Sequence, residues 1–415
     1  MTNDNSKSEL LFKRHYPALD LLRAVAITLV MFRHFADRGF TGGSDAYILD
    51  SKFLMWGSNG VILFFVLSGF LIGGQIMEEL SNSSFSFKKF FFKRLLRIFP
   101  PYYFAIIINV ILILTGLVAT ELTSSDGFAH YFNNFIVNIF SHILYLQIYI
   151  APEYFATVYW SLSVEEHFYI LSPTLLYLGH RYAKRYLGTG LFLLLLLIVA
   201  MRMADYYWRV DLAFWFDKEV GRLLKIPLEP NLRTPQKILM IPLFLVNLFD
   251  GILLGVLAAY LFIRYNEWLK SVSNIIKIAI LFLSLDILAF CVIYRVPSGR
   301  IVYLDIAWGS LIPSFGFSLL ILTCITLPLE KIIRPKKLFS SVAKLSYTMY
   351  LYHLFLILPF LALFKETFFT NSFTSFYTLF AAYFIVTTVI SAGIYSLVDR
   401  PCMKYRAKVI SRWRD

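Results

Sequence analysis

Long runs of apolar residues, separated by short polar segments, dominate this chain. Ten of these runs are long enough to cross the roughly 30 Å of hydrocarbon in a bilayer. They cover residues 18–36, 59–77, 101–119, 158–179, 187–203, 238–263, 274–294, 303–327, 343–364 and 376–398. The pattern predicts an all-α polytopic membrane protein, a bundle of about ten transmembrane helices.

The distribution of basic residues predicts how this bundle is oriented. With ten spans, most of the 39 Lys and Arg residues lie on the same side of the membrane as both termini. The positive-inside rule identifies this side as the cytoplasm. The stretch from Thr120 to Trp160 has no Lys or Arg and is expected outside. Within it, Asn134 to Ile150 is apolar. We interpret it as a re-entrant or interfacial helix, because an eleventh span would place the Lys- and Arg-rich connections on the wrong sides of the membrane.

We expect a single transmembrane domain over residues 1–400 and a basic cytoplasmic tail over 401–415. The exterior segment 204–237 is interpreted as a cap loop, either a small folded element that attracts an anionic substrate or an interfacial loop anchored by aromatic residues. No cleaved signal peptide is expected, since no small-residue cleavage site follows an early apolar region.

Composition and charge limit the kinds of function expected of this chain. The chain is 58% hydrophobic and 16% charged, and its net charge of +13 is explained by cytoplasmic loops that lie on anionic membrane lipids. No nucleic-acid partner is expected, because no basic segment accompanies a nucleic-acid-binding motif. The 3 cysteines form neither a disulfide framework nor a metal motif, so no metal is expected.

Two basic residues lie in the first apolar run. Arg23 and His34 are eleven positions apart, so on a helix their directions differ by only about 20°. Ionisable groups inside a bilayer are costly and usually face a bundle interior or a water-filled cavity. This pair is therefore a candidate functional site.

Two further segments are candidate ligand-binding sites. Ser68 and Gly69 place small residues among Phe and Leu, which admits either a neighbouring helix or a slim ligand. Arg94 and Arg97 lie three positions apart just before two prolines that are expected to open the next span. Their guanidinium forks suit phosphate oxygens, of a nucleotide cofactor or of a lipid headgroup.

Other polar residues interrupt later spans. The segment from Trp160 to Tyr169 holds Glu165, Glu166 and His167. Glu165 is expected near the same end of the bundle as His34, where a carboxylate would orient an imidazole that acts as a base; the alternative is a structural polar cluster. His353 and Asp250 also lie in apolar runs, as candidate substrate contacts or as packing residues.

Five segments together resemble the membrane acyltransferase family 3, bacterial O-acyltransferases that modify O-antigen, exopolysaccharide, peptidoglycan, Nod factors and some antibiotics. They follow in order along the chain: Leu19–Ala24 with His34, Phe64–Ile72, Arg94–Pro101, Trp160–Tyr169 and Leu345–His353. The resemblance runs from Leu19 to about Pro401. The chain departs from many members at Ile62, where they have Asp, and at His167, where they have Gln.

The resemblance implies an acyl-CoA donor, with acetyl-CoA expected, and a bacterial cytoplasmic (inner) membrane location. It matches the family's essential Arg and His to Arg23 and His34, and its cytoplasmic Arg pair to Arg94 and Arg97. The acceptor is expected to be a carbohydrate, either free or lipid-linked. Because the chain ends soon after Arg400, transfer is expected either directly to the final acceptor or through a separate exterior transferase.

We therefore expect acyl transfer in a pore through the bundle. In this scheme His34 is the general base, and Glu165 or Glu166 orients it. The donor contacts Arg23, Arg94, Arg97, Ser68 and Gly69, and the acceptor contacts Trp160, Tyr169, His167, His353 and Asp250. An acetyl-His intermediate is an open variant. The competing hypothesis is a transporter or flippase of lipid-linked sugars, which would also need basic residues in an aqueous cavity.

Overall fold

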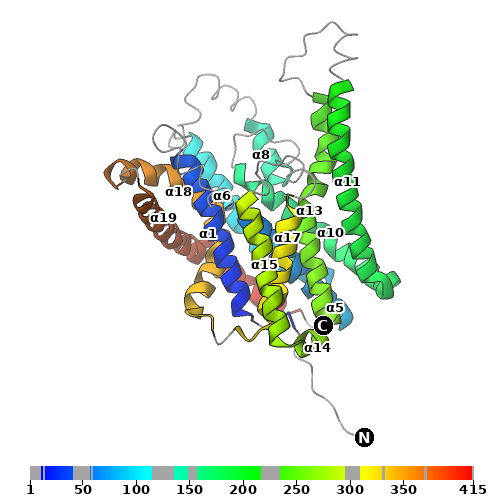
Figure 1. Ribbon diagram of the computed structural model, residues 1–415. Coiled ribbons are helices and arrows are strands. Elements are labelled where there is room, and N and C mark those ends of the chain that lie inside the picture. The colour runs from blue at the N-terminus through cyan, green and yellow to red at the C-terminus, as the bar shows by residue number, and fades with distance from the viewer. Residues whose placement is uncertain are drawn as a thin grey trace.

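The computed structural model describes residues 11–12, 15–40, 57, 59–114, 135–147, 157–215, 234–294, 309–329, 332–368 and 372–413. All regular secondary structure in these ranges is helical (Figure 1). The α-helices are α1 Pro17–Gly39, α4 Asn59–Ser68, α5 Gly74–Ser81, α6 Phe87–Leu114, α8 Phe135–Ile143, α10 Trp160–Ala183, α11 Leu187–Trp215, α13 Thr234–Arg264, α14 Asn266–Ser271, α15 Asn274–Tyr294, α17 Leu311–Thr326, α18 Lys336–Phe368, α19 Phe373–Ile394 and α20 Arg400–Ile410. Two π-helical turns, η3 Gly69–Gly73 and η8 Tyr395–Asp399, and two 3₁₀ turns, η4 Thr157–Tyr159 and η5 Lys184–Tyr186, join some of them.

A helix lies at each of the ten predicted apolar runs. By length and composition, six described stretches are able to cross a membrane: Asn59–Ser81, Phe87–Leu112, Trp160–Met203, Asn274–Tyr294, Lys336–Thr367 and Phe373–Ile410. The third of these contains α10 and the first part of α11, which the sequence predicts as separate spans. A multi-pass membrane protein is confirmed, whereas ten crossings and cytoplasmic termini stay predictions.

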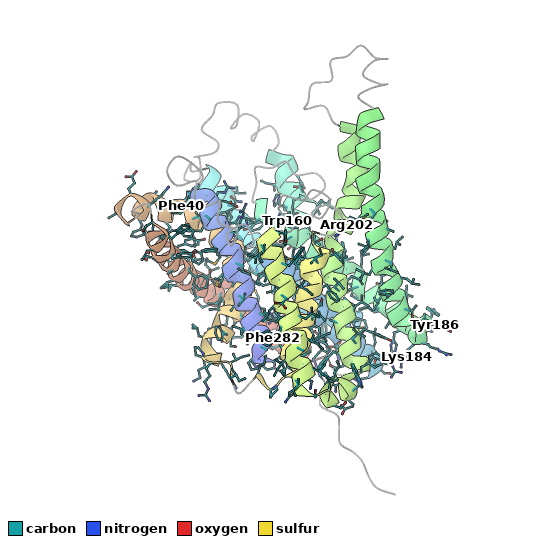
Figure 2. All side chains as sticks on the ribbon, in the orientation of Figure 1. Phe40, Trp160, Lys184, Tyr186, Arg202 and Phe282 are labelled. Atoms are coloured by element: carbon teal, nitrogen blue, oxygen red, sulfur yellow. The ribbon has the colours of Figure 1, made fainter. Side chains whose placement is uncertain are left out.

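The first helix lies in the middle of the bundle. It packs along α18 on one side and α4 on the other, and α4 with η3 packs against α13. Aromatic side chains fill the space between α1 and α19, where the ring centroids of Phe35 and Tyr383 are 4.9 Å apart. Figure 2 shows Phe40, just after α1, at the upper end of the bundle, so α1 runs upward from Pro17. Arg23 therefore lies lower in the bundle than His34.

The predicted break at the prolines is wrong. Pro100 and Pro101 lie inside the continuous helix α6, and Arg94 and Arg97 are within the first half of that helix rather than at its end. Proline has a backbone φ that suits a helix, so its cost is the lost N–H group and local crowding, which a packed helix is able to absorb.

Short elements lie beside the long helices. The α8 helix has 9 residues, which rise only about 14 Å, too little to cross a bilayer, as expected of a re-entrant or interfacial segment. Tyr102 and Tyr103 of α6 donate hydrogen bonds to the carbonyls of His142 and Ile143 near its end, at 3.0 and 2.9 Å. The α8 helix is therefore attached to α6.

Two predicted non-membrane segments contain helix. Residues 204–215 of the expected cap loop continue α11, and residues 234–237 begin α13; the intervening positions lie outside the described residues. In Figure 1 these ends of α11 and α13 extend together beyond the other labelled helices. The expected tail forms α20, which packs on α6, and the ring of Trp413 lies 4.9 Å from that of Phe92.

Candidate active site

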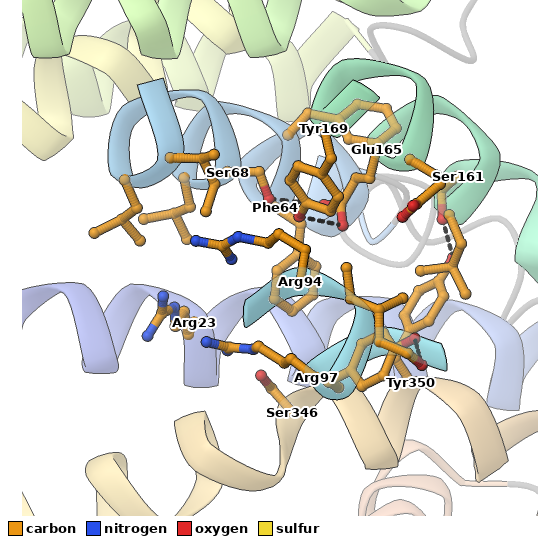
Figure 3. Close-up of a pocket in the computed structure, with 18 of the residues that line it drawn as sticks. Arg23, Phe64, Ser68, Arg94, Arg97, Ser161, Glu165, Tyr169, Ser346 and Tyr350 are labelled. Atoms are coloured by element: carbon orange, nitrogen blue, oxygen red, sulfur yellow. Dashed lines mark hydrogen bonds between the residues drawn. The ribbon is translucent and has the colours of Figure 1, made fainter. Parts of the chain in front are cut away.

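A cavity of about 250 Å³ lies between α1, α4, α6, α10 and α18 (Figure 3). Its polar lining holds most of the residues singled out by their chemistry in the sequence. These polar residues are Arg23, Ser68, Gln75, Arg94, Arg97, Ser161, Glu165, Glu166, Tyr169, Ser346, Tyr347 and Tyr350. The lining has three guanidinium groups and two carboxyl groups, so its formal charge favours an anionic ligand.

Three arginines from two helices converge on this cavity. Arg94 and Arg97 project from the same side of α6 because they are three residues apart, and Arg23 reaches the cavity from α1. Figure 3 shows the three guanidinium groups turned toward the same space. The nearest carboxylate oxygen of Asp20 is 3.9 Å from Arg23, which leaves that arginine able to bind a ligand.

Arg94 is held in place by neutral groups. Its guanidinium lies over the ring of Tyr169 at 5.5 Å and donates a long hydrogen bond of 3.4 Å to the side-chain carbonyl of Gln75. Its buried Nε has no hydrogen-bond partner among the described residues. A buried donor without a partner is costly, and an anion in the cavity would satisfy it.

Glu165 is the centre of a hydrogen-bonded group on the opposite wall. Ser68 of α4 donates to one of its carboxylate oxygens at 2.8 Å, and Tyr169 donates to the other at 3.1 Å. Figure 3 shows this group facing the arginines. The adjacent Glu166 also lines the cavity, and its Oε2 is buried with no hydrogen-bond partner among the described residues.

The two histidines form a second group. The ring centroids of His34 and His353 are 5.3 Å apart. His353 is fully buried, and its Nδ1 lies 2.8 Å from the carbonyl of Tyr350. A carbonyl oxygen only accepts hydrogen bonds, so this Nδ1 carries a proton. In the neutral ring Nε2 is then the acceptor, and it has no hydrogen-bond partner in the described part of the chain.

Tyr350 joins the two groups. It lines the arginine cavity, and its ring lies 5.7 Å from that of His353. Its hydroxyl donates to the carbonyl of Val158 at 2.6 Å and accepts from Ser161. Tyr350 is among the lining residues of the cavity, and His34 and His353 are not. Tyr350 therefore lies between the arginine cavity and His353, and a continuous pore from the arginines to His34 stays a prediction.

The structure gives three of the predicted site residues surroundings other than the expected ones. Glu165 and Glu166 lie with the arginines and not with His34, because α10 places them beside α4 and α6 rather than at the upper part of α1. The group beside His34 is His353 of α18. Gly69 faces away from the cavity, and a Cβ atom there would be 1.9 Å from the carbonyl oxygen of Ile252 in α13. Its role is close helix packing.

Three of the predicted substrate contacts also have other surroundings. Asp250 is 1% exposed, accepts hydrogen bonds from Arg202 at 3.0 Å and Ser310 at 2.8 Å, and does not line the cavity. Trp160 packs with its ring 6.1 Å from that of Phe65. The Nδ1 of His167 lies 2.6 Å from the carbonyl of Ser163, one turn earlier in α10. Only Tyr169, of the predicted acceptor contacts, lines the cavity.

Sequence reasoning missed five polar lining residues, which are Gln75, Ser161, Ser346, Tyr347 and Tyr350. Tyr350 had a signal, since it precedes His353 by three positions on one helix. Gln75 lies one turn after Leu71, and the sequence has no other signal for it. An amide in an apolar run is as often a helix contact as a ligand contact.

Comparison with known proteins shows the family to which this chain belongs. A family model described as an acyltransferase domain matches residues 16–396. The chain therefore belongs to the acyltransferase 3 family, which confirms the resemblance read from its five segments. No solved structure matches this chain.

Curated relatives agree with that class. The chain is 28% identical over 179 residues to the peptidoglycan O-acetyltransferase OatA of Listeria monocytogenes, a match to 41% of this chain and 26% of that protein. It is 32% identical over 171 residues to the putative O-acetyltransferase SACOL0978 of Staphylococcus aureus, which covers 39% of this chain and 25% of the relative. These matches span about a quarter of those proteins. Nodulation protein 10 of Rhizobium leguminosarum is 25% identical over 414 residues, 96% of both chains.

Proposed function

We propose that this protein is a membrane O-acyltransferase that moves an acyl group, acetyl by analogy with its relatives, from acyl-CoA to a hydroxyl of a glycan or lipid-linked precursor. One observation carries the proposal: three arginines from two helices converge on one cavity in a chain of the acyltransferase 3 family. The relatives' names, a peptidoglycan O-acetyltransferase among them, supply the class of acceptor.

The arginine cavity is the donor site in this proposal. The phosphates of CoA bind Arg23, Arg94 and Arg97, since guanidinium groups make paired, charge-assisted hydrogen bonds to phosphate oxygens. The donor enters from the cytoplasm, at the end of the bundle where α1 begins. Glu165 holds Ser68 and Tyr169 in place along the wall that the pantetheine arm follows.

The acyl group is transferred near His34. His34 takes the proton of the acceptor hydroxyl, whose oxygen attacks the thioester carbon; the C–O bond forms and the C–S bond breaks. The thiolate of CoA leaves and receives that proton. Arg23 lies about 16 Å from His34 along α1, too far to stabilise the same oxyanion, so it serves the donor. Tyr350, which lies between the arginine cavity and His353, borders the path of the arm.

Donor binding by the purified protein tests this proposal. In detergent, Arg94→Gln is expected to raise the KM for acetyl-CoA roughly ten- to hundred-fold, because hydrogen bonds to charged groups are each worth about 1.5–3 kcal/mol. Arg181→Gln is the matched control, since Arg181 is exposed on α10 and bonds to Tyr177. A protein that never releases thiol from acetyl-CoA, with or without a glycan acceptor, would be a carrier instead.

The proposal also includes the membrane in which the enzyme resides and the side on which it delivers its acyl group. The enzyme resides in the bacterial cytoplasmic (inner) membrane and delivers its acyl group on the exterior side, to the acceptor or to a separate exterior transferase. Comparing glycan acetylation in cells with and without this protein identifies the acceptor.

A further inference from the structure

A second cavity, of about 410 Å³, lies outside the proposed active site. Its lining comes from α5, α10, η5, α11 and α13 and consists of Met77, Ser81, His180, Lys184, Arg185, Leu187, Tyr260, Ile263 and Arg264. Met77 and Gln75, which lines the first cavity, are two positions apart and point about 160° apart around α5. The second cavity therefore faces a different side of that helix from the donor site.

The lining of this cavity is basic and has no acidic member. Lys184 and Arg185 lie on η5, Arg264 ends α13, and His180 lies in the last turn of α10. None of the four makes an ion pair with a carboxylate in the described part of the chain. Glu267, the acidic residue close to Arg264 in sequence, pairs with Lys270 at 3.1 Å.

Aromatic residues place this cavity at the depth of lipid headgroups. Tyr182, Tyr186 and Tyr265 flank the basic residues in sequence and are 76%, 61% and 49% exposed. Exposed tyrosines gather where a membrane protein meets the interface between lipid and water. Leucines on the adjoining turns of α10 and α11 are exposed as well, which is expected of a surface that faces lipid chains. Figure 2 shows Lys184 and Tyr186 together at this lower corner of the bundle.

We propose that this cavity binds the headgroup of an anionic phospholipid that carries two phosphates, of the cardiolipin type. Three permanently charged side chains on two walls provide more positive charge than a single monoanionic phosphate neutralises. Basic pockets between transmembrane helices are suited to such headgroups. The hydroxyl of Tyr260 and the exposed rings beside the cavity provide contacts for the glycerol backbone and the upper acyl chains.

Native mass spectrometry of the detergent-solubilised protein, titrated with cardiolipin, tests this proposal. Lys184→Gln/Arg185→Gln is expected to weaken cardiolipin binding about twenty-five-fold, since each basic residue near the headgroups contributes about a five-fold effect. Both side chains are exposed, so the variant should fold. The matched control, Lys404→Gln/Lys408→Gln, removes the same charge from exposed positions on α20 and should bind as the unmodified protein does.

Three outcomes overturn the proposal: equal cardiolipin binding by the double variant, an equal loss in the control, or displacement of the lipid by inorganic pyrophosphate at low concentration. The last would mean that the cavity binds a soluble phosphate compound. Tight binding of phosphatidylcholine would also count against it. The test requires no acyl transfer, so its failure leaves the proposed enzyme activity unaffected.

Discussion

The carboxylate of Glu78 accepts a hydrogen bond from the backbone N–H of Phe12 at 3.0 Å, across 66 positions of sequence. The other carboxylate oxygen accepts from the N–H of Leu11. Phe12 lies with its ring 5.2 Å from that of Phe70 and lines the arginine cavity. A buried carboxylate on α5 therefore holds the residues before α1 as part of the cavity wall.

This relationship predicts faster hydrogen exchange when the carboxylate is lost. In Glu78→Gln, the amides of Leu11 and Phe12 should exchange roughly ten- to hundred-fold faster, because hydrogen bonds to a charged group are worth about 1.5–3 kcal/mol. Glu79→Gln, which changes the neighbouring carboxylate bonded to Gln75, should leave these two amides unchanged. Equal exchange in all three proteins would mean that Glu78 does not hold this segment.

The close approach of η3 to α13 predicts a stability difference between two glycines. In Gly69→Ala the new methyl group meets the carbonyl of Ile252, so the helices must separate, which should cost about 1–3 kcal/mol and lower the Tm. Gly190→Ala is the control, since nothing lies within 4 Å of a Cβ there, and it should keep or slightly raise the Tm. Thermal unfolding in detergent measures both, and equal Tm values would contradict the packing role.

The buried pair of Asp250 and Arg202 predicts a loss of stability without a change in substrate binding. Removing one partner of a buried ion pair costs about 3–5 kcal/mol, so Asp250→Asn should unfold at markedly lower temperature. Its folded fraction should keep the KM values for donor and acceptor. Asp286→Asn, at an exposed position of α15, should match the unmodified protein. A raised acceptor KM at normal stability would restore Asp250 as a substrate contact.

The apolar pattern was sufficient to predict the helices but not every contact between them. Each predicted run became a helix, since an apolar stretch in lipid must satisfy its backbone internally. The path of α6 through Pro100 and Pro101 was not predictable, because a proline ends a helix or is absorbed by it depending on the neighbouring helices.

The candidate site was predictable residue by residue but not as an assembly. Arg23 and Glu165 were chosen because charge is costly in an apolar run, and Arg94 and Arg97 because their guanidinium forks suit phosphate oxygens. All four line one cavity. Which carboxylate or imidazole lies beside His34 depends on the position of each helix in the bundle. Spacing along one helix carries no such information, so Glu165 was predicted where the structure has His353.

The pair of His34 and His353 predicts a non-additive loss of catalysis. His34→Ala should lower kcat about a hundred- to ten-thousand-fold, the usual contribution of a general base, and leave the KM for acetyl-CoA within about two-fold. His353→Ala should lower kcat less, because that ring positions His34 and does not itself take the proton. The double variant should then be no slower than His34→Ala, since residues that act as one unit are not additive.

A pH profile separates positioning from simple packing at His353. In the unmodified protein, kcat should rise with pH as His34 loses its proton and becomes able to accept one from the hydroxyl. This rise should vanish in His34→Ala and move along the pH axis in His353→Ala, because the neighbouring ring sets the surroundings of the base. If His353→Ala only lowers the Tm and keeps the profile in place, His353 is a packing residue and His34 acts without it.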